Sequence, residues 1–407
     1  MNKLIFVTLN TMQNDGGGTI RIKSLFTYSK DLRNSILVSN SSDLKFVENE
    51  VVLGVVFSTK EKRLFQFLVT FFPISLVKRV FFKKLSHIER VFVDNLEHIN
   101  GDYVFCEYLD NSVGYYLKKS GIINGYVNDL HGIATNEFAN QQSGLGLWNR
   151  FKYYVAKKHD AKILAEANGH IFSTVAMKSF FYAKYPKFRS KDVFYIPYLL
   201  DAKSLDSVIN YDYYHAIFRE FKLEKFSHII FYAGAYKEIG GVTDLIEAFS
   251  SVLAKFPDAG LVLVGGGRCQ GLVDKKISQL RLSTQVVQLG YRPHESLYTL
   301  QQLADVIVCP DRDNLYSNLI VHLKYFDSVA SEKPVICGSF DSVNEIAGAE
   351  QLSLPYTPSD LDSLANAITY ALINKEAILP LLVGYRQLVK DRFTYDSYKD
   401  TICSITY

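Results

Sequence analysis

Two glycine-rich segments each stand between an apolar run and a helical pattern, where a chain can bind an anion. The first spans residues 13–19 and includes Gly17 and Gly18, and the second includes Gly266 after the apolar run Leu261–Val264. Glycines there let backbone N–H groups approach a phosphate at the positive end of a helix. The first segment lacks G-x-G-x-x-G spacing, so a dinucleotide site is not predicted. A plain flexible turn is its alternative; for the second we favour a tight turn that clears space beside a ligand.

Charged side chains after two later apolar runs supply a second kind of chemistry. Asp311 begins an Asp-Arg-Asp sequence after the run Asp305–Cys309, and Lys324 and Asp327 lie in the helical pattern that follows. A carboxylate can accept hydrogen bonds from a diol, and an ammonium group can pair with a phosphate. We interpret Asp311 as part of a polar loop beside a site, with a direct sugar or metal contact as the lesser alternative.

His131 is a further candidate because it lies in an Asp-Leu-His-Gly sequence shortly after the predicted strand Ile123–Val127. An imidazole in a loop after a strand can donate to a ligand, and near pH 7 it exists in either charge state. The alternative is a structural histidine that caps neighbouring backbone groups.

Short apolar runs alternate with helical patterns along the whole chain, which predicts parallel sheets covered by helices. The predicted strands of the first half are Lys3–Thr8, Ser35–Ser39, Asp102–Glu107, Ile123–Val127, Gly169–Ser173 and Val193–Ile196. Those of the second half are His228–Ala233, Leu261–Gly265, Val286–Leu289, Asp305–Cys309 and Pro334–Cys337. We therefore predict two layered α/β units in tandem, joined near residues 200–204.

Composition excludes several classes of protein. The chain has 407 residues, of which 48% are hydrophobic and 21% charged, and a formal charge of +3. These values exclude a disordered chain and a strongly basic nucleic-acid binder. The five cysteines form no C-x-x-C pair, so a reducing compartment fits best. No apolar stretch reaches about 18 residues, and the N-terminus lacks a cleavage site, so we expect a soluble or peripheral protein that is not secreted.

The positive charge is concentrated in one segment. Residues 60–90 contain eight Lys or Arg and two Asp or Glu, a net charge of +6, interleaved with phenylalanines. Such a pattern can bind an anionic bilayer, with Phe rings at the headgroup boundary and Lys on the phosphates. A pair of amphipathic helices with Phe in the core and a solvated basic face explains the pattern equally well.

Several motifs of the second half agree in order and spacing with one protein family. They are Gly290–Glu295, the Ala-Asp-Val run that ends at Pro310, Asp327 six positions before Lys333, the sequence Lys333–Ile336, and Gly234 with Gly241–Phe249. Together they resemble the donor-binding half of retaining GT-B glycosyltransferases, especially family 4 (glycosyl transferases group 1). The resemblance covers about residues 228–350 well and the first half more loosely.

The resemblance implies an α/β protein of the GT-B fold class, with two facing Rossmann-like α/β/α domains. It implies an acceptor-binding domain at residues 1–202 and a nucleotide-sugar-binding domain at residues 203–390. A helical segment at residues 391–407 would return to pack on the N-terminal domain.

The resemblance also implies roles for individual residues. Asp327 matches the carboxylate that binds the ribose hydroxyls, and the loop 314–319, which contains Asn318, would offer backbone N–H groups to the diphosphate. Tyr291 and Arg292 occupy the turn whose backbone faces the base. His131, in the first domain, matches a histidine that points toward the reacting sugar.

Three positions depart from the family pattern. Leu319 stands where the first Glu of a Glu-x7-Glu motif contacts the donor sugar, and Ala235 and Gly240 stand where an Arg and a Lys bind the diphosphate. Lys237 in the same loop would supply the missing charge and serve in catalysis. Lys324, one turn before Asp327, could supply that charge as a donor-binding residue instead. Without such cations the leaving group would lose several kcal/mol of stabilisation.

The function implied is transfer of a sugar, with retention, from a UDP- or GDP-sugar to a saccharide acceptor that is free or lipid-linked. The setting implied is bacterial surface polysaccharide synthesis, such as O-antigen or capsule, in the cytoplasm, with residues 60–90 docking on the inner face of the plasma membrane. No metal, other cofactor or nucleic acid is implied. A non-catalytic GT-B scaffold that binds a saccharide or a partner is the alternative, because it explains the three departures directly. A nucleotide-sugar epimerase fits less well because no acidic pair is placed to exchange a sugar proton.

Overall fold

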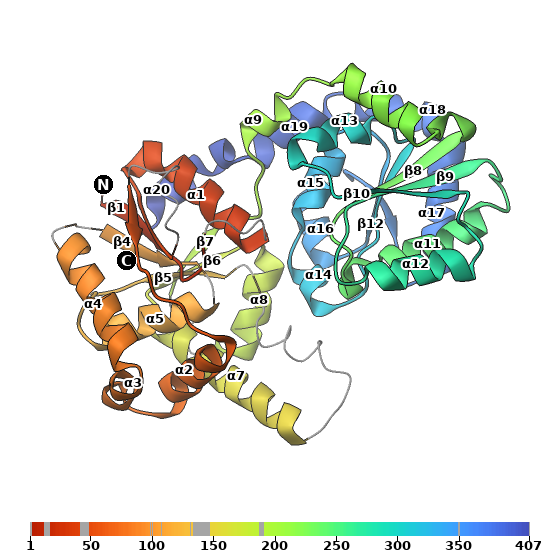
Figure 1. Cartoon of the computed structure of the whole chain (residues 1–407). Coiled ribbons are helices and arrows are strands. Elements are labelled where there is room, and N and C mark those ends of the chain that lie inside the picture. Colours follow the sequence, from red (N-terminus) through yellow and green to blue (C-terminus); the bar gives the residue numbers. More distant parts are fainter. Residues whose placement is uncertain are drawn as a thin grey trace. The chain divides into compact units, whose positions relative to one another are not determined.

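The computed structural model describes residues 2–11, 17–40, 49–97, 99, 101–106, 108–130, 132, 147–186, 191–348 and 351–406. The chain divides into two compact units (Figure 1), Met1–Pro197 with Tyr398–Tyr407, and Tyr198–Ser397. Each unit is a parallel sheet with helices on both faces. In the described part of the chain, no helix is both long and apolar enough to cross a membrane.

The first unit contains a seven-stranded sheet in the order β3-β2-β1-β4-β5-β6-β7. Its strands are β1 (Lys3–Val7), β2 (Ile36–Ser39), β3 (Glu50–Val52), β4 (Gly101–Phe105), β5 (Val127–Leu130), β6 (Gly169–Phe172) and β7 (Asp192–Tyr195). Its helices include α1 (Gly17–Arg33), α2 (Thr59–Phe71), α3 (Ile74–Val80), α4 (Phe82–Leu96), α5 (Tyr108–Lys119), α7 (Leu147–Glu166) and α8 (Val175–Lys184). The interior strand β1 is apolar from Leu4 to Val7, and these four residues are buried, as expected for a strand that helices cover on both faces.

The C-terminal helix α20 (Lys399–Ser404) packs on this first unit, beside α1. The buried Arg33 of α1 donates to the carbonyl oxygen of Ile405 at 2.5 Å and to the Asp102 carboxylate at 2.7 Å. One guanidinium thus ties the chain end to α1 and to β4, since a buried arginine needs several acceptors. The predicted return of the C-terminus to the first domain is confirmed.

The second unit contains a six-stranded sheet in the order β10-β9-β8-β11-β12-β13. Its strands are β8 (His228–Ala233), β9 (Ala259–Val264), β10 (Val286–Gly290), β11 (Val306–Cys309), β12 (Val335–Gly338) and β13 (Leu354–Tyr356). Its helices include α9 (Ala202–Leu205), α10 (Tyr211–Glu220), α11 (Val242–Val252), α12 (Gln270–Gln279), α13 (Leu297–Gln301), α14 (Leu315–Leu319), α15 (Leu323–Val329), α16 (Asp341–Ala347), α17 (Leu361–Ile373), α18 (Lys375–Leu382) and α19 (Tyr385–Arg392).

Most predicted strands form within one or two residues of their expected bounds, but the strand predicted at Ile123–Val127 is wrong. The fifth strand is Val127–Leu130, because its pairing with β4 begins only at Val127 and continues along β6 from that residue. Ile123 is buried in the preceding turn instead, so its apolar character reflects packing and not a strand. The short edge strands β3 and β13 were missed because three residues carry too little pattern.

The basic segment forms α2, α3 and α4 and divides its phenylalanines between core and surface. Phe65 and Phe81 are buried, whereas Phe71, Phe72 and Phe82 are exposed. Each acidic residue of the segment has a lysine partner, in the pairs Lys84–Glu61 at 2.7 Å and Lys78–Glu89 at 2.8 Å. The other cations of the segment, at positions 60, 62, 63, 79, 83 and 90, form no ion pair with any described residue.

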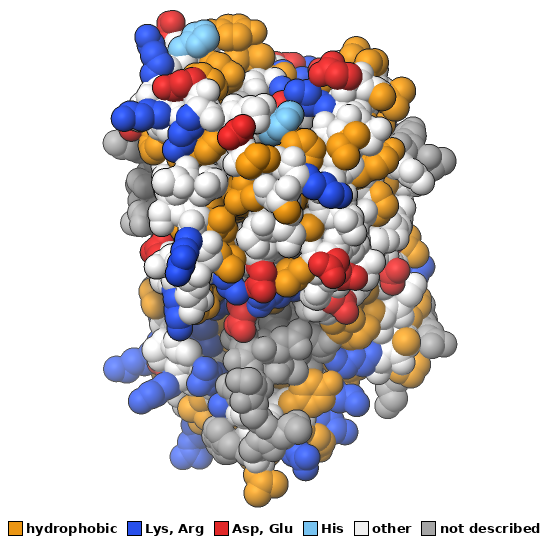
Figure 2. All heavy atoms as spheres, turned by 90° about the vertical axis from the view of Figure 1, so that its right-hand side faces the viewer, with side chains coloured by type: hydrophobic (Ala, Val, Ile, Leu, Met, Phe, Trp, Pro, Cys, Tyr) orange, Lys and Arg blue, Asp and Glu red, His pale blue; other side chains and the backbone are white. Residues whose placement is uncertain are grey.

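An aromatic contact extends this surface onto the neighbouring helix α7. The ring of Phe71 stacks on Tyr154 of α7, with centroids 6.3 Å apart. Figure 2 shows Lys and Arg side chains beside hydrophobic ones in the lower part of one face.

Candidate functional site in the second domain

The loops that follow β8, β9 and β11 approach one another at the carboxyl edge of the second sheet. A Cβ at Gly241, where φ is +62°, would lie 1.5 Å from the carbonyl oxygen of Pro310. A Cβ at Gly265, where φ is +124°, would lie 2.1 Å from the carbonyl oxygen of Gly234. These glycines are therefore required for loop packing, because no side chain fits at either position. Ligands of open α/β sheets bind at this edge.

Gly266, a predicted ligand contact, lies in the middle of the loop after β9. Its carbonyl oxygen accepts from the N–H of Tyr236 at 2.8 Å, which joins this loop to the loop after β8. A Cβ on Gly266 would meet nothing closer than the Gln270 side chain at 3.7 Å. Gly266 thus lies where the two loops are joined, and the position itself has room for a side chain.

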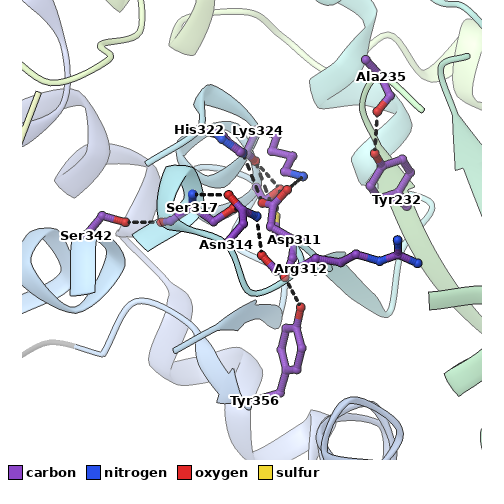
Figure 3. A network of polar contacts seen from close by, with 12 residues as sticks. Tyr232, Ala235, Asp311, Arg312, Asn314, Ser317, His322, Lys324, Ser342 and Tyr356 are labelled. Atoms are coloured by element: carbon purple, nitrogen blue, oxygen red, sulfur yellow. Dashed lines mark hydrogen bonds and ion pairs between the residues drawn. The ribbon is translucent and has the colours of Figure 1, made fainter. Parts of the chain in front are cut away.

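Asp311 is the centre of the polar network drawn in Figure 3. Its Oδ1 accepts from Lys324 Nζ at 2.7 Å, and its Oδ2 lies 3.2 Å from Nδ1 of His322. The Tyr356 hydroxyl donates to the Asp311 backbone carbonyl at 2.9 Å. The side chains of Asp311 and Lys324 are only 8% and 17% exposed. The end of β11 and the start of α15 thus bring two basic side chains to one buried carboxylate.

Mutual attraction keeps this buried pair ionised. Burial alone would raise the pKa of Asp311 and lower the pKa of Lys324, because each charge loses water. The charges of Lys324 and His322 outweigh that effect and hold the pKa of Asp311 well below its usual value. In the same way, Asp311 holds the pKa of Lys324 above the usual value for a lysine. Burial raises the pKa of Tyr232 to about 12. Its ring lies 5.6 Å from the Lys324 ammonium and stays a neutral phenol at pH 7.

The segment predicted as a loop at residues 314–319 is instead the short helix α14, which begins directly after Asn314. The Asn314 side chain accepts from the Ser317 N–H at 2.9 Å, so this backbone donor is already used by a helix cap. Asn318 donates to the Asp313 carboxylate at 3.1 Å, and Leu319 is 6% exposed. Leu319, at the position of the family's first Glu, is therefore buried.

Asp327, the predicted ribose ligand, has a partner that the sequence did not predict. Nε2 of His294 lies 3.2 Å from its Oδ2. His294 lies in the turn after β10, in the same segment as Tyr291 and Arg292. Tyr291 is 76% exposed, whereas Arg292 donates to the Leu289 carbonyl at 3.1 Å. The turn after β10 and the helix α15 are thus joined at Asp327.

Lys237, the predicted catalytic cation, lies exposed in the loop after β8 and makes no ion pair with any described residue. It is not brought together with Asp311. Arg312, between the two aspartates of the Asp-Arg-Asp sequence, turns away to the start of α11. Its Nε donates to Asp244 at 2.7 Å, and a second nitrogen donates to the Thr243 hydroxyl at 3.0 Å.

In the first unit, His131 lies outside the described residues, as does most of the glycine segment before α1. Gly17 and Gly18 form the start of α1. Arg21, one turn further along, is 1% exposed and pairs with Asp129 on β5 at 2.8 Å. It also donates to the carbonyl oxygens of Ile196 and Pro197 at 2.8 and 2.7 Å, so it fixes the end of the first unit to α1.

Sequence reasoning missed His322, His294 and Tyr356. His322 and Lys324 stand two positions apart at the start of α15. This spacing indicates two basic groups that can face one acidic side chain. His294 was part of a quoted motif but received no role. Nothing in the sequence places Tyr356 on Asp311, because they lie 45 residues apart.

Comparisons with known proteins agree with this architecture. Residues 227–374 match the family model described as "Glycosyl transferases group 1". No curated protein sequence matches at a significant level. Among solved structures, sucrose-phosphate synthase from Thermosynechococcus elongatus aligns with a TM-score of 0.74 and 16% identity, over 99% of this chain and 98% of its own. Anabaena HepE in complex with UDP and glucose aligns with a TM-score of 0.73 and 15% identity, over 99% and 98%.

A third similar structure is the trehalose-6-phosphate protein of E. coli bound with UDP-2-fluoro glucose, with a TM-score of 0.65, 13% identity and 100% coverage of both chains. At such identities the likeness concerns the fold. The resemblance predicted from the second half of the sequence is confirmed: this chain has the GT-B fold, and its residues 227–374 carry the sequence pattern of the group 1 glycosyl transferases.

Proposed function

We propose that this protein is a glycosyltransferase that moves a sugar from a nucleotide-sugar, a UDP- or GDP-sugar, to a saccharide acceptor. The observation that carries the proposal is the family match over residues 227–374 together with Asp327, a carboxylate at the position of the ribose ligand. In this proposal Asp327 accepts from the ribose, Tyr291 and Arg292 line the place of the base, and Lys237 and Lys324 stabilise the diphosphate.

The reaction proceeds with retention and without a metal, as in the family that the sequence resembles. In the front-face mechanism proposed for that family, the leaving phosphate takes the acceptor proton while the protein supplies positioning and charge. Lys324 is suited to stabilise that phosphate because Asp311 keeps it protonated. His131 is proposed to face the reacting sugar from the first domain.

A nucleotide stability screen tests the donor assignment. UDP, GDP and their sugars should raise the melting temperature of the wild-type protein, and Asp327→Ala should weaken the preferred nucleotide at least about tenfold, since it removes a hydrogen bond to a charged group. Asp362→Ala changes an exposed carboxylate on α17 of the same domain and serves as the control. Equal affinities for wild type and Asp327→Ala would remove Asp327 from the site.

Lys237 is tested by comparing a nucleoside with its diphosphate. Lys237→Ala should weaken UDP or GDP more than uridine or guanosine, because only the diphosphate meets an added positive charge. Equal effects on both ligands would exclude Lys237 from the diphosphate site.

The acceptor is proposed to be lipid-linked, in bacterial surface polysaccharide synthesis, with α2, α3 and α4 docking on anionic lipid. The exposed Phe71, Phe72 and Phe82 and the unpaired cations around them support this surface. Binding to vesicles of phosphatidylcholine with phosphatidylglycerol should fall with added salt. Arg79→Gln with Lys83→Gln should weaken it roughly thirtyfold, at about 1 kcal/mol per cation.

The control for that experiment is Lys255→Gln with Lys275→Gln, two exposed lysines of the second unit. Binding that does not depend on lipid charge or salt would show that the segment is only a solvated basic face.

The alternative function, a non-catalytic GT-B scaffold, is favoured by Leu319, Ala235 and Gly240. A protein that no nucleotide stabilises, and that hydrolyses no UDP- or GDP-sugar, would support the scaffold.

A further inference from the structure

We propose that His294 is a positioning residue for ribose recognition, which it performs by holding one oxygen of Asp327 so that the other faces the ribose. This inference rests on the proposed nucleotide-sugar function and assigns a role to a residue to which the sequence analysis gave none.

The geometry of the contact supports a positioning role. Nε2 of His294 lies 3.2 Å from Oδ2 of Asp327, and the side chains are 60% and 12% exposed. No described residue hydrogen-bonds to Oδ1 of Asp327. A carboxylate accepts through both oxygens, so the contact with His294 leaves Oδ1 available to a ligand hydroxyl.

The short side chain of Asp327 explains why a positioning residue is needed. The resembled family has a glutamate at this position, and aspartate is shorter by one carbon–carbon bond, or about 1.5 Å. A shorter carboxylate reaches less far from α15 and has to be turned toward its ligand. His294 comes from the turn after β10 and draws Oδ2 to that side, which fixes the orientation of the whole group.

Charge favours the same arrangement. Two acidic groups face His294: Asp327 from α15, and Glu295 from its own turn. The hydrogen bond with Asp327, and then the charges of Asp327 and Glu295, raise the pKa of His294 above its usual value. The imidazolium offsets the negative charge of Asp327, which would otherwise repel the diphosphate of a nucleotide.

The expected pH dependence follows from the direction of that shift. Below its raised pKa, His294 is charged and forms a charge-assisted hydrogen bond with Asp327. As pH rises through that pKa, His294 loses its charge and the hydrogen bond weakens. Nucleotide affinity should therefore decline from pH 6 to pH 9 in the wild-type protein. His294→Ala should bind about tenfold more weakly at pH 6, because a charge-assisted hydrogen bond is lost. The decline that His294 causes should be absent from this variant, which leaves only the pH dependence from titration of the nucleotide's own phosphate.

Titration calorimetry with UDP and GDP, and with the 2′,3′-dideoxy form of whichever binds, tests the inference. The dideoxy ligand lacks the hydroxyls that Asp327 would accept from, so His294→Ala should weaken it far less than the ribose form. His294→Gln keeps a neutral donor and should retain part of the affinity without the pH dependence. His215→Ala, an exposed histidine on α10, is the matched control. Melting without ligand shows whether each variant folds.

The outcomes separate this inference from the function on which it rests. If wild type binds a nucleotide and His294→Ala binds it equally well with the same pH dependence, His294 has no part in recognition and only this inference fails. If His294→Ala binds more tightly, the imidazole competes with the ribose and the positioning role is wrong. If wild type binds neither nucleotide at any pH, the proposed function fails and this inference fails with it.

Discussion

Replacing Asp311 by asparagine should destabilise the second domain by about 3 kcal/mol, because it leaves the Lys324 ammonium buried without its counter-charge. Breaking a buried ion pair costs roughly 3–5 kcal/mol. The lower end of this free-energy range applies because the Lys324 side chain is 17% exposed and can turn toward water. Asp311 has a second basic partner, His322, which is 25% exposed and is less costly to leave unpaired.

The assay has to follow the second domain alone, because a protein of two domains need not unfold in one step. Hydrogen exchange of the β11 and β12 amides reports on that domain directly. A loss of about 3 kcal/mol should speed their exchange roughly a hundredfold.

Asp244→Asn is the matched control, because it breaks an acid–base pair of the same domain that is more exposed, at 35% and 19%. It should cost about 1 kcal/mol. Lys324→Met combined with Asp311→Asn should recover part of the loss, since the unpaired charge is then gone. If Asp311→Asn is no worse than Asp244→Asn, the buried pair does not stabilise this domain and the reasoning fails.

Three further predictions concern stability. The difference in unfolding free energy between wild type and Asp311→Asn should be constant from pH 8 to pH 5 and shrink below the ordinary pKa of 3.8, since Asp311 has a lowered pKa and loses its stabilising charge only in acid. Gly241→Ala should cost about 3 kcal/mol or more in the second domain, because its methyl group would collide with the Pro310 carbonyl at a positive φ; a stable variant seen by hydrogen exchange would contradict the packing. Arg21→Met should lower the stability of the first unit by about 3 kcal/mol, measured by hydrogen exchange of the β1 and β5 amides, because it removes the ion pair with Asp129 from a buried site; unchanged exchange would exclude that role.

The layered fold could be predicted because buried parallel strands and amphipathic helices leave strong patterns. The run Leu261–Val264 is wholly buried in β9, and the period that begins at Leu245 marks the buried face of α11. The strand at Val127–Leu130 was misplaced by several residues, because its sequence contains two buried polar residues, Asn128 and Asp129, the second of which pairs with Arg21. Pattern alone does not reveal a partner that lies a hundred residues away.

The residues of the candidate site also fall into those that the sequence could predict and those that it could not. Asp327 and Lys324 could be found because family spacing fixes their positions on one helix. The partners of these two residues, His294 and Asp311, lie in the segments that follow β10 and β11. The loop geometry that brings them together is not encoded in any short segment. The segment 314–319 was misread because its cap, Asn314, is equally common in turns and at helix starts.

The charge balance of the second domain bears on the choice between an enzyme and a scaffold. Lys324 is already paired with Asp311, so a diphosphate at this edge would meet a neutral pair plus whatever charge His322 carries. Lys237, by contrast, is exposed and makes no ion pair with any described residue, so its full charge is available at the cost of weaker attraction in water. An enzyme that lost the family's two cations therefore has to combine a buried, oriented ammonium with a mobile exposed one. A scaffold needs neither for binding, and in a scaffold the Lys324–Asp311 pair would contribute to stability alone.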